Sequence, residues 1–175
     1  MKLVLPSTKY KDSFIAAAEE FRAESVKNTR IAAYDRYDIS ELKSNFGAFV
    51  ERQLSKVEGH SLSPGFVPMT EYWLVDADEY IGRASVRHRL TPQLLEIGGH
   101  IGYDIRPSKR GKGYGNIVLQ LAIPKARELG VDRILVTCDE HNVASRKVIE
   151  KNGGVLENKV PNPETGDNKL RYWIT

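Results

Sequence analysis

The sequence predicts a single α/β domain over residues 1–175, an α+β layered fold in which helices flank a mixed, mostly antiparallel sheet. Three observations predict this class. Short apolar segments alternate with turn residues, helical apolar patterns lie before and between them, and a glycine-rich loop joins a strand to a helix. A chain of 175 residues is long enough to bury one core without a disulfide or a structural metal.

Composition narrows the class of protein further. Cysteine occurs once, at Cys138, which excludes an internal disulfide. No apolar run approaches the ~20 residues that span a bilayer, and no signal peptide opens the chain, so we expect a soluble, cytoplasmic protein with no membrane partner. The net charge is +3, and basic residues gather at 83–89 and 106–112. No nucleic-acid motif accompanies them, so we do not expect a nucleic-acid partner.

The first segment predicts a strand followed by a helix. Residues 2–5 are typical of a short strand, which Pro6 ends. Asp12 or Ser13 is expected to cap the helix that follows. Apolar side chains recur there at helical spacing, at Phe14, Ala17, Ala18 and Phe21.

A second helix is predicted over residues 40–57, where an apolar stripe has helical period and Gly59 ends it. Residues 60–68 carry two prolines and a glycine, which predicts a loop. Such a loop could grip a substrate, although most loops only connect elements.

Three strands are then predicted to form an antiparallel meander. Residues 70–75 and 80–86 are the first two, joined by a polar turn. The third spans residues 97–105, and Gly98 and Gly99 within it predict a bulge or a close approach of two backbones.

The second half alternates helices and strands. From about residue 116, helical spacing predicts a helix that ends at Gly130, with Pro124 expected to kink it. The remaining elements are a β-branched strand, a short helix and a closing hairpin, at residues 133–137, 142–151, and 154–157 with 170–174.

Residues 110–115, Arg-Gly-Lys-Gly-Tyr-Gly, are the most informative stretch. Glycine lets the backbone bend sharply and lets a ligand approach bare N–H groups, and the start of the following helix is positively polarised. Together these features predict a phosphate seat, with Arg110 and Lys112 at its rim. The string fits neither a P-loop nor a dinucleotide fingerprint, since the glycine spacing of both differs.

Two motifs resemble the GNAT superfamily of acetyl-CoA-dependent N-acetyltransferases. Arg110, Gly113 and Gly115 match the family's phosphate loop, Arg/Gln-x-x-Gly-x-Gly/Ala. About 30 residues on, residues 142–145 followed by Lys151 and Gly153 resemble its second motif. The chain also resembles a bacterial branch of predicted acetyltransferases. The family resemblance implies a sheet of about seven strands flanked by about four helices.

The resemblance also implies a ligand and its contacts. Acetyl-CoA would donate acetyl to a primary amine by direct attack, with no metal, in a monomer or homodimer. Its thioester would lie where two neighbouring strands splay apart, and the acceptor, a small molecule or a peptide, would lie between the first two helices, the 60–68 loop and the last hairpin. The implied cofactor contacts are Tyr103, Ile105, Arg110, Gly111, Lys112, Gly113, Tyr114, Gly115, Asn116, Asn142 and Ser145.

The sequence leaves the catalytic groups open, because Ile149 occupies the position where many relatives carry a tyrosine that protonates the thiolate. Tyr172, Tyr103 and Cys138 are the candidates to protonate the departing thiolate. For the base we expect His100, whose ordinary pKa near 6.5 suits proton transfer at neutral pH; a structural histidine is the alternative, and Glu96 is a weaker carboxylate candidate. No histidine pair has metal-ligand spacing.

The missing tyrosine keeps a second function open, a non-catalytic acyl-CoA-binding or sensor domain. A nucleic-acid module using the basic residues is a third hypothesis, and it predicts an affinity that falls steeply with salt.

Overall fold

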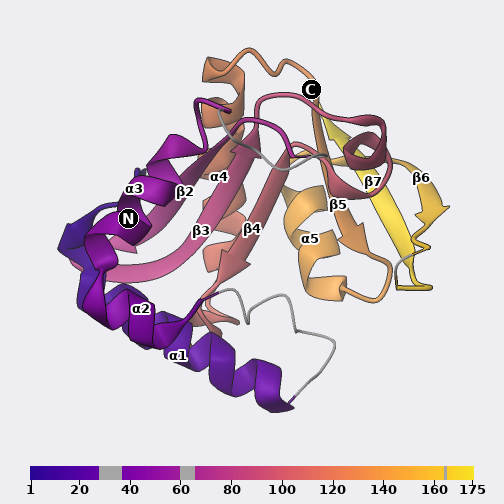
Figure 1. The fold of residues 1–175 in the computed structure, drawn as a ribbon. Helices are drawn as coiled ribbons and strands as arrows, with labels where there is room; N and C mark the ends of the chain where they lie inside the picture. The colour runs from indigo at the N-terminus through magenta and orange to yellow at the C-terminus, as the bar shows by residue number, and fades with distance from the viewer. Residues whose placement is uncertain (28–36, 60–65, 164) are drawn as a thin grey trace.

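Seven strands form two antiparallel sheets in this computed structural model, which describes residues 1–27, 37–59, 66–163 and 165–175 (Figure 1). The first sheet has the order β1-β2-β3-β4, and the second has the order β5-β7-β6. The predicted fold class is therefore confirmed, with the strands divided between two sheets. The strands are β1 (Lys2–Val4), β2 (Met69–Asp76), β3 (Glu79–Arg87), β4 (Ile101–Ile105), β5 (Ile134–Asp139), β6 (Val155–Pro161) and β7 (Asn168–Ile174).

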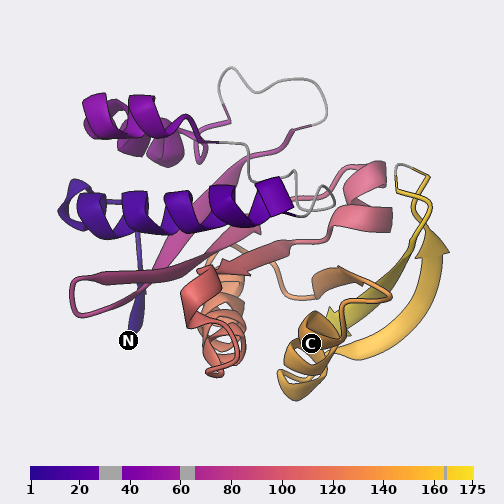
Figure 2. The same cartoon turned by 90° about the horizontal axis from the view of Figure 1, so that it is seen from below.

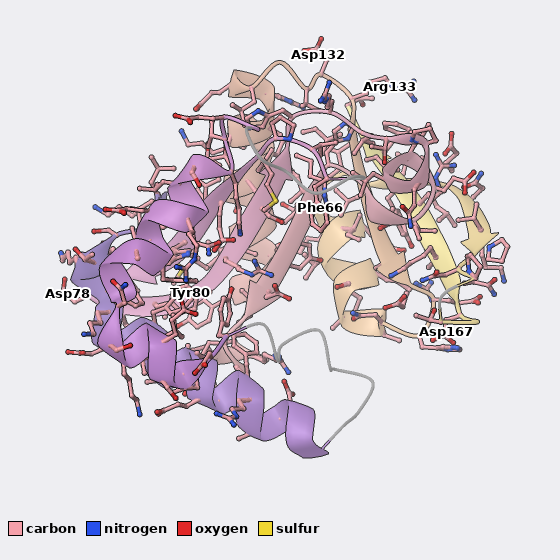
Figure 3. The ribbon with its side chains drawn as sticks, viewed as in Figure 1. Phe66, Asp78, Tyr80, Asp132, Arg133 and Asp167 are labelled. Carbon is pink, nitrogen blue, oxygen red and sulfur yellow. The ribbon has the colours of Figure 1, made fainter. Side chains whose placement is uncertain are left out.

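The helices form a layer on each side of the strands, as Figure 2 shows. On one side lie α1 (Lys11–Lys27), α2 (Ile39–Ser44) and α3 (Phe46–Ser55), and on the other lie α4 (Tyr114–Glu128) and α5 (Val143–Lys151). We call the side that carries α1, α2 and α3 the front face. This is also the side seen in Figure 3, where the β2–β3 turn at Asp78 and the β6–β7 hairpin at Asp167 mark opposite ends of the molecule.

Each helical layer covers a core of its own. Under α1 and α3 the core is aromatic, and Phe14 stacks on the fully buried Trp73 with ring centroids 4.6 Å apart. Tyr80 meets Phe14 edge-on at 4.9 Å within the same core. Beneath α4 the core is aliphatic, with Val118, Leu119 and other fully buried side chains facing the sheet. The alternating strand residues divide between these two cores because successive side chains point to opposite faces.

The two sheets meet beside Gly99 and His100. Gly99 and Val136 form an isolated bridge, and the His100 amide donates to the Leu135 carbonyl at 2.7 Å. In Figure 1, β4 and β5 diverge from there, and α5 is drawn between their lower ends. The splay that the family resemblance implied between the fourth and fifth strands is thus present.

The third predicted strand is correct only in its second half. Residues Leu94–Gly98 form a short helical turn, and β4 begins at Ile101. Gly99, at a φ of 73°, redirects the chain between them. A Cβ at Gly99 would lie 2.7 Å from the Leu135 carbonyl oxygen, so the predicted close backbone approach is confirmed.

Helix boundaries differ from expectation near capping side chains. The predicted 40–57 helix divides at Asn45, whose side chain accepts the Ala48 amide and starts α3. Helix α1 begins at Lys11, after a 3-10 turn that Ser7 caps, so neither Asp12 nor Ser13 is the cap. The Ser13 hydroxyl instead accepts the Tyr80 amide at 2.9 Å.

The remaining elements lie close to their predicted ranges. Helix α4 starts at Tyr114, slightly earlier than expected, and contains Pro124 as predicted. The closing hairpin is longer than predicted, because β6 extends to Pro161 and shortens the polar loop. Residues 60–65 of the predicted acceptor loop lie outside the described residues.

Candidate active site

The glycine-rich loop presents a row of unpaired backbone amides. Gly111 and Gly113 adopt φ values of 75° and 83°, which lie in the left-handed region that favours glycine. Gly113 caps α4, since its carbonyl accepts the Asn116 amide at 3.0 Å. In the part of the chain that the structure describes, the N–H groups of residues 111–115 have no hydrogen-bond partner. The predicted anion seat therefore has its donors free.

The third glycine of the loop has a different role. A Cβ at Gly115 would lie 3.2 Å from Val148 Cγ2, whereas a Cβ at Gly111 or Gly113 would meet nothing within 4 Å. Gly115 thus lets α4 and α5 pack closely, and the other two supply the turn. Asn116 and Tyr114 also belong to this packing. Asn152 on the α5 side donates to Asn116 Oδ1 at 3.0 Å, and Tyr114 packs on the aliphatic core.

Most of the basic side chains around the loop are already paired. Arg110 donates to Glu24 on α1 at 2.5 Å and to the Ile105 carbonyl at 3.0 Å. Arg106 pairs with Glu20 at 2.7 Å. Lys112 is exposed and makes no ion pair with the described residues, so it carries the positive charge that remains at the rim predicted from the sequence.

Strand β4 turns part of its backbone toward β5. In an antiparallel pair, hydrogen-bonded and non-bonded positions alternate. Bonds from the Arg87 amide to His100 and from the Arg106 amide to Ile81 set this alternation. The amides of Tyr103 and Ile105 consequently point away from β3, toward the space between the two sheets. These are the two residues that the family resemblance assigned to the cofactor arm.

The second motif begins α5 on the far side of that space. Asn142 is the N-cap, and its Oδ1 accepts the Ser145 amide at 3.0 Å. Its side-chain NH2 group makes no hydrogen bond to the described residues. The Tyr103 hydroxyl reaches across from β4 to the Ser145 carbonyl at 3.5 Å, so β4 and the second motif face one another.

His100 lies at the junction of the sheets, with its acceptor nitrogen occupied. The Leu135 amide donates to Nδ1 at 2.9 Å. Burial, together with the charge of Arg87, lowers the pKa of His100 below its ordinary 6.5. A neutral ring with Nδ1 accepting carries its proton on Nε2. The predicted role as a base would require this bond to break, and the geometry favours a structural role.

The candidate proton donors differ in burial and in whether their protons are already shared with a partner. Tyr172 is 1% exposed, and its hydroxyl donates to Glu150 at 3.1 Å. Burial raises the pKa of Tyr103 to about 12 and that of Cys138 to about 11, so both hold their protons at neutral pH. Ile149, at the usual tyrosine position, is fully buried in the aliphatic core.

Sequence reasoning missed a charged network on the front face. Arg83 on β3 donates to Glu71 Oε2 on β2 at 3.1 Å and to Asp104 Oδ2 on β4 at 2.9 Å. Trp73 Nε1 donates to the other oxygen of the fully buried Glu71 at 3.0 Å. The signal was present, since Arg83 and Asp104 interrupt two apolar strands, and they are direct cross-strand partners.

A cavity of about 180 Å³ lies on the same face. Of its described lining residues, Arg83 comes from the sheet and the others come from the segment between Tyr37 and Lys56. Phe49 and Tyr37 give it aromatic walls. Its polar lining is Tyr37, Asp38, Glu41, Gln53, Lys56 and Arg83.

The family is decided by sequence. A family model described as "Acetyltransferase (GNAT) domain" matches residues 18–155, which is most of the chain. The chain belongs to this family. It is an acetyl-CoA-dependent N-acetyltransferase, as the glycine loop and the second motif implied. No protein of curated function matches the chain significantly in sequence.

Solved acetyltransferases share the fold of this GNAT domain at low identity. The microcin C7 self-immunity acetyltransferase MccE, in complex with acetyl-CoA and AMP, is 17% identical, with 99% of this chain and 91% of that chain covered and a TM-score of 0.68. RimL, a ribosomal L7/L12 alpha-N-protein acetyltransferase in complex with coenzyme A, is 19% identical over 98% and 92% of the chains, with a TM-score of 0.68. An acetyltransferase from Salmonella typhimurium that modifies the N-terminal serine of L7/L12 is 18% identical over 98% and 92%, with a TM-score of 0.61.

This GNAT domain has neither a membrane-spanning helix nor a metal-binding cluster among its described residues. Among the described residues, no helix is long and apolar enough to cross a bilayer. Within the same residues, no group of three or more histidine, cysteine and acidic side chains is placed to hold a metal ion.

Proposed function

We propose that this enzyme acetylates a primary amine, which attacks the thioester of acetyl-CoA directly. The observation that carries the proposal is the run of unpaired N–H groups at residues 111–115, next to a strand edge whose amides also point outward. Backbone donors at a helix N-terminus suit a diphosphate, and a free strand edge suits an extended amide chain. When bound, acetyl-CoA supplies an acetyl group activated as a thioester.

Several of the predicted contacts have a matching group in this chain. The loop amides would hold the diphosphate, with Lys112 beside them. The backbone of Tyr103 and Ile105 would pair with the amides of the pantetheine arm. Asn142 would offer its side-chain NH2 group while its oxygen caps α5. For Arg110 we propose a supporting role, because its guanidinium holds the loop against α1 through Glu24.

Tyr103 is our preferred donor for the departing thiolate. Its side chain is partly exposed on the edge strand, whereas Tyr172 is enclosed beneath α5 and already donates to Glu150. Burial keeps Tyr103 protonated at neutral pH, which a proton donor requires.

The acceptor would approach over the front face. The cavity there is lined by aromatic side chains, by the carboxylates of Asp38 and Glu41, and by Lys56 and Arg83. Its aromatic walls and carboxylates would suit an amine carried on an apolar or aromatic group. Phe66, 67% exposed and labelled near the middle of Figure 3, adds an apolar surface on that side. A small-molecule amine, a polyamine and a protein N-terminus all remain candidates, the last being the target of the neighbour RimL.

A panel of amines tests this function. Acetyl-CoA is mixed with an N-terminal serine peptide, a lysine peptide, spermidine and an aromatic primary amine, and released thiol is measured. We expect turnover with at least one amine and none with its N-acetylated form. Tight coenzyme A binding without turnover of any amine would instead support the sensor alternative.

A further inference from the structure

We propose that Asp104 is the proton acceptor for the attacking amine and that Arg83 is the positioning residue that aims it. This inference rests on the proposed amine acetyltransferase function and adds a residue to it. Four features of the structure carry it: the place of Asp104 on β4, its free oxygen, the charge around it and its accessibility.

Asp104 lies between the two residues whose backbone points into the space between the sheets. The amides of Tyr103 and Ile105 face that space, while Asp104 itself is the hydrogen-bonded partner of Arg83. The side chains of Tyr103 and Ile105 pack on the aliphatic core beneath α4. Because side chains alternate along a strand, that of Asp104 projects from the front face. An acceptor on that face and a thioester arm along β4 would meet beside this carboxylate.

The carboxylate is held by one oxygen. Arg83 Nε and Nη2 both lie 2.9 Å from Asp104 Oδ2. Oδ1 has no hydrogen bond to any described residue and is not enclosed, since the side chain of Asp104 is 26% exposed. The Arg83 side chain is only 12% exposed and is anchored on its other side by Glu71. Arg83 therefore fixes Oδ2 of Asp104, and Oδ1 is available to accept a proton.

The charges around Asp104 are balanced, so no excess positive charge opposes an approaching ammonium ion. One guanidinium, that of Arg83, serves the two carboxylates Glu71 and Asp104, so this trio has a net charge of −1. Lys56, the residue that follows α3, is 4.0 Å from Glu71 and adds one positive charge, so these four side chains together are neutral. Burial raises the pKa of Asp104 to about 6, against the opposing charge of Arg110. Such a group is ionised at neutral pH yet basic enough to accept a proton.

The other charged groups near Asp104 are engaged elsewhere. On α1, Glu24 is paired with Arg110 and Glu20 with Arg106. His100, the rival base on the same segment, has Nδ1 bonded to the Leu135 amide. Glu24 Oε2 also lacks a hydrogen-bond partner but is buried, whereas Asp104 is partly exposed, so of these described groups Asp104 is the one whose unbonded oxygen an acceptor can reach.

Protons and bonds balance over a single turnover. The acceptor ammonium gives one proton to Asp104 Oδ1, and its nitrogen lone pair then bonds to the acetyl carbonyl carbon. The carbon–sulfur bond breaks, its electron pair leaves with sulfur, and the second N–H proton ends on that sulfur as the thiol. Asp104 returns its proton to solvent, so the products are an acetamide, coenzyme A and one proton.

The test compares Asp104→Asn with the wild type on the best amine from the panel. We expect kcat/KM to fall about 10²- to 10³-fold, the size of a general-base contribution. The wild-type rate should decline as pH falls through about 6, and the variant should lose this dependence. Coenzyme A affinity, measured by calorimetry, should change less than twofold. Asp104→Glu, which keeps a carboxylate, should retain the pH dependence with a smaller loss of rate.

Two controls separate this role from a structural ion pair. Glu71→Gln removes the other carboxylate of Arg83 and should keep the pH dependence. Asp139→Asn removes an exposed partner of Lys169 at the end of β5 and should leave the rate unchanged. Wild-type rate and pH profile in Asp104→Asn would overturn the inference while leaving the proposed function standing. Absence of turnover in the wild type would instead overturn the function.

If the variants fold poorly, an NMR titration of the wild type tests the inference without a measurement of turnover. In the wild type, the side-chain carboxyl carbon of Asp104 is followed by NMR during a pH titration with coenzyme A present. Titration near pH 6 supports the inference. A midpoint below about 4, the ordinary range for aspartate, would overturn it.

Discussion

At the scale of single residues, a comparison of two glycines at the ends of α4 distinguishes the effect of a side chain on ligand binding from its effect on backbone strain. Gly113 and Gly130 share a φ of 83°, and a Cβ at either would meet nothing within 4 Å. A side chain in this region costs about 1–2 kcal/mol at both positions. Only Gly113 belongs to the loop of free amides.

We therefore expect Gly113→Asp to lower coenzyme A affinity at least tenfold, because it adds a carboxylate to the anion seat. Gly130→Asp should lose similar stability and keep its affinity. Calorimetric titration with coenzyme A and urea denaturation measure the two quantities. Equal affinity in both variants would contradict the role of the loop.

His100 gives a second prediction at this scale. Its pKa is lowered in the folded protein, mainly by burial, so the unfolded chain binds a proton more readily below pH 6.5. The stability contributed by the neutral ring is present above pH 6.5 and is lost as pH falls. His100→Gln keeps an oxygen to accept the Leu135 amide but cannot titrate.

Urea denaturation at about pH 7.5 and pH 5.5 should show a smaller acid loss for His100→Gln than for the wild type. His100→Phe leaves the amide of Leu135 unpaired and should cost about 1–3 kcal/mol at either pH. Identical pH dependence in wild type and His100→Gln would rule out the structural role. Lost turnover in a fully stable His100→Gln would favour the predicted base.

Individual roles were the hardest part to predict from sequence. The free amides of the loop followed from glycine and helix chemistry alone, which are local. The pairing of Arg110 with Glu24 and the bond between His100 and Leu135 join residues far apart in the chain. No local pattern encodes such partners. To predict the Arg83–Asp104 pair, the register of β3 against β4 must be known, and sequence periodicity leaves that register open.

At the scale of elements, two asparagine caps allow a matched comparison. Asn142 starts α5 and Asn45 starts α3, each through a side-chain oxygen that accepts a backbone amide. Removal of such a cap costs about 1 kcal/mol. Only Asn142 faces the space between β4 and β5.

We expect Asn45→Ala to lower stability alone and Asn142→Ala to lower both stability and coenzyme A affinity. Asn142→Asp keeps the capping oxygen but loses the NH2 donor, so its stability should be retained while affinity falls. Thermal denaturation and calorimetry distinguish these outcomes. Full affinity in Asn142→Asp would remove this residue from the cofactor contacts.

Most elements could be predicted because their signals are local: helical period, β-branched runs and turn residues. The failures occurred where a side chain or a glycine redirects the backbone. Asn45 divides one apolar stripe into α2 and α3, and Gly99 ends a helical turn where an apolar run suggested a strand. In both places a single residue outweighs the periodic pattern around it.

At the scale of the whole molecule, the contact between the sheets at Gly99 is the critical feature. Gly99→Ala would place a Cβ 2.7 Å from the Leu135 oxygen, in addition to the cost of a φ of 73°. Gly153→Ala has a comparable φ of 84° and meets nothing within 4 Å, so it serves as the control.

We expect Gly99→Ala to destabilise the protein by at least 1 kcal/mol more than Gly153→Ala, which carries the backbone cost of about 1–2 kcal/mol alone. Coenzyme A affinity should also fall for Gly99→Ala, since the spacing of β4 and β5 depends on this junction. Urea denaturation and calorimetry measure both effects. Equal stability of the two variants would show that the two sheets can move apart at Gly99 without loss of stability.

The placement of the two tryptophans gives each sheet its own optical reporter. Trp73 is fully buried among the aromatic side chains of the first sheet, and Trp173 lies in the second with the Arg133 guanidinium 4.6 Å from its ring. Two single-tryptophan proteins would thus emit from different halves of the chain. Their fluorescence during denaturation would reveal whether the halves melt as one cooperative unit or in succession.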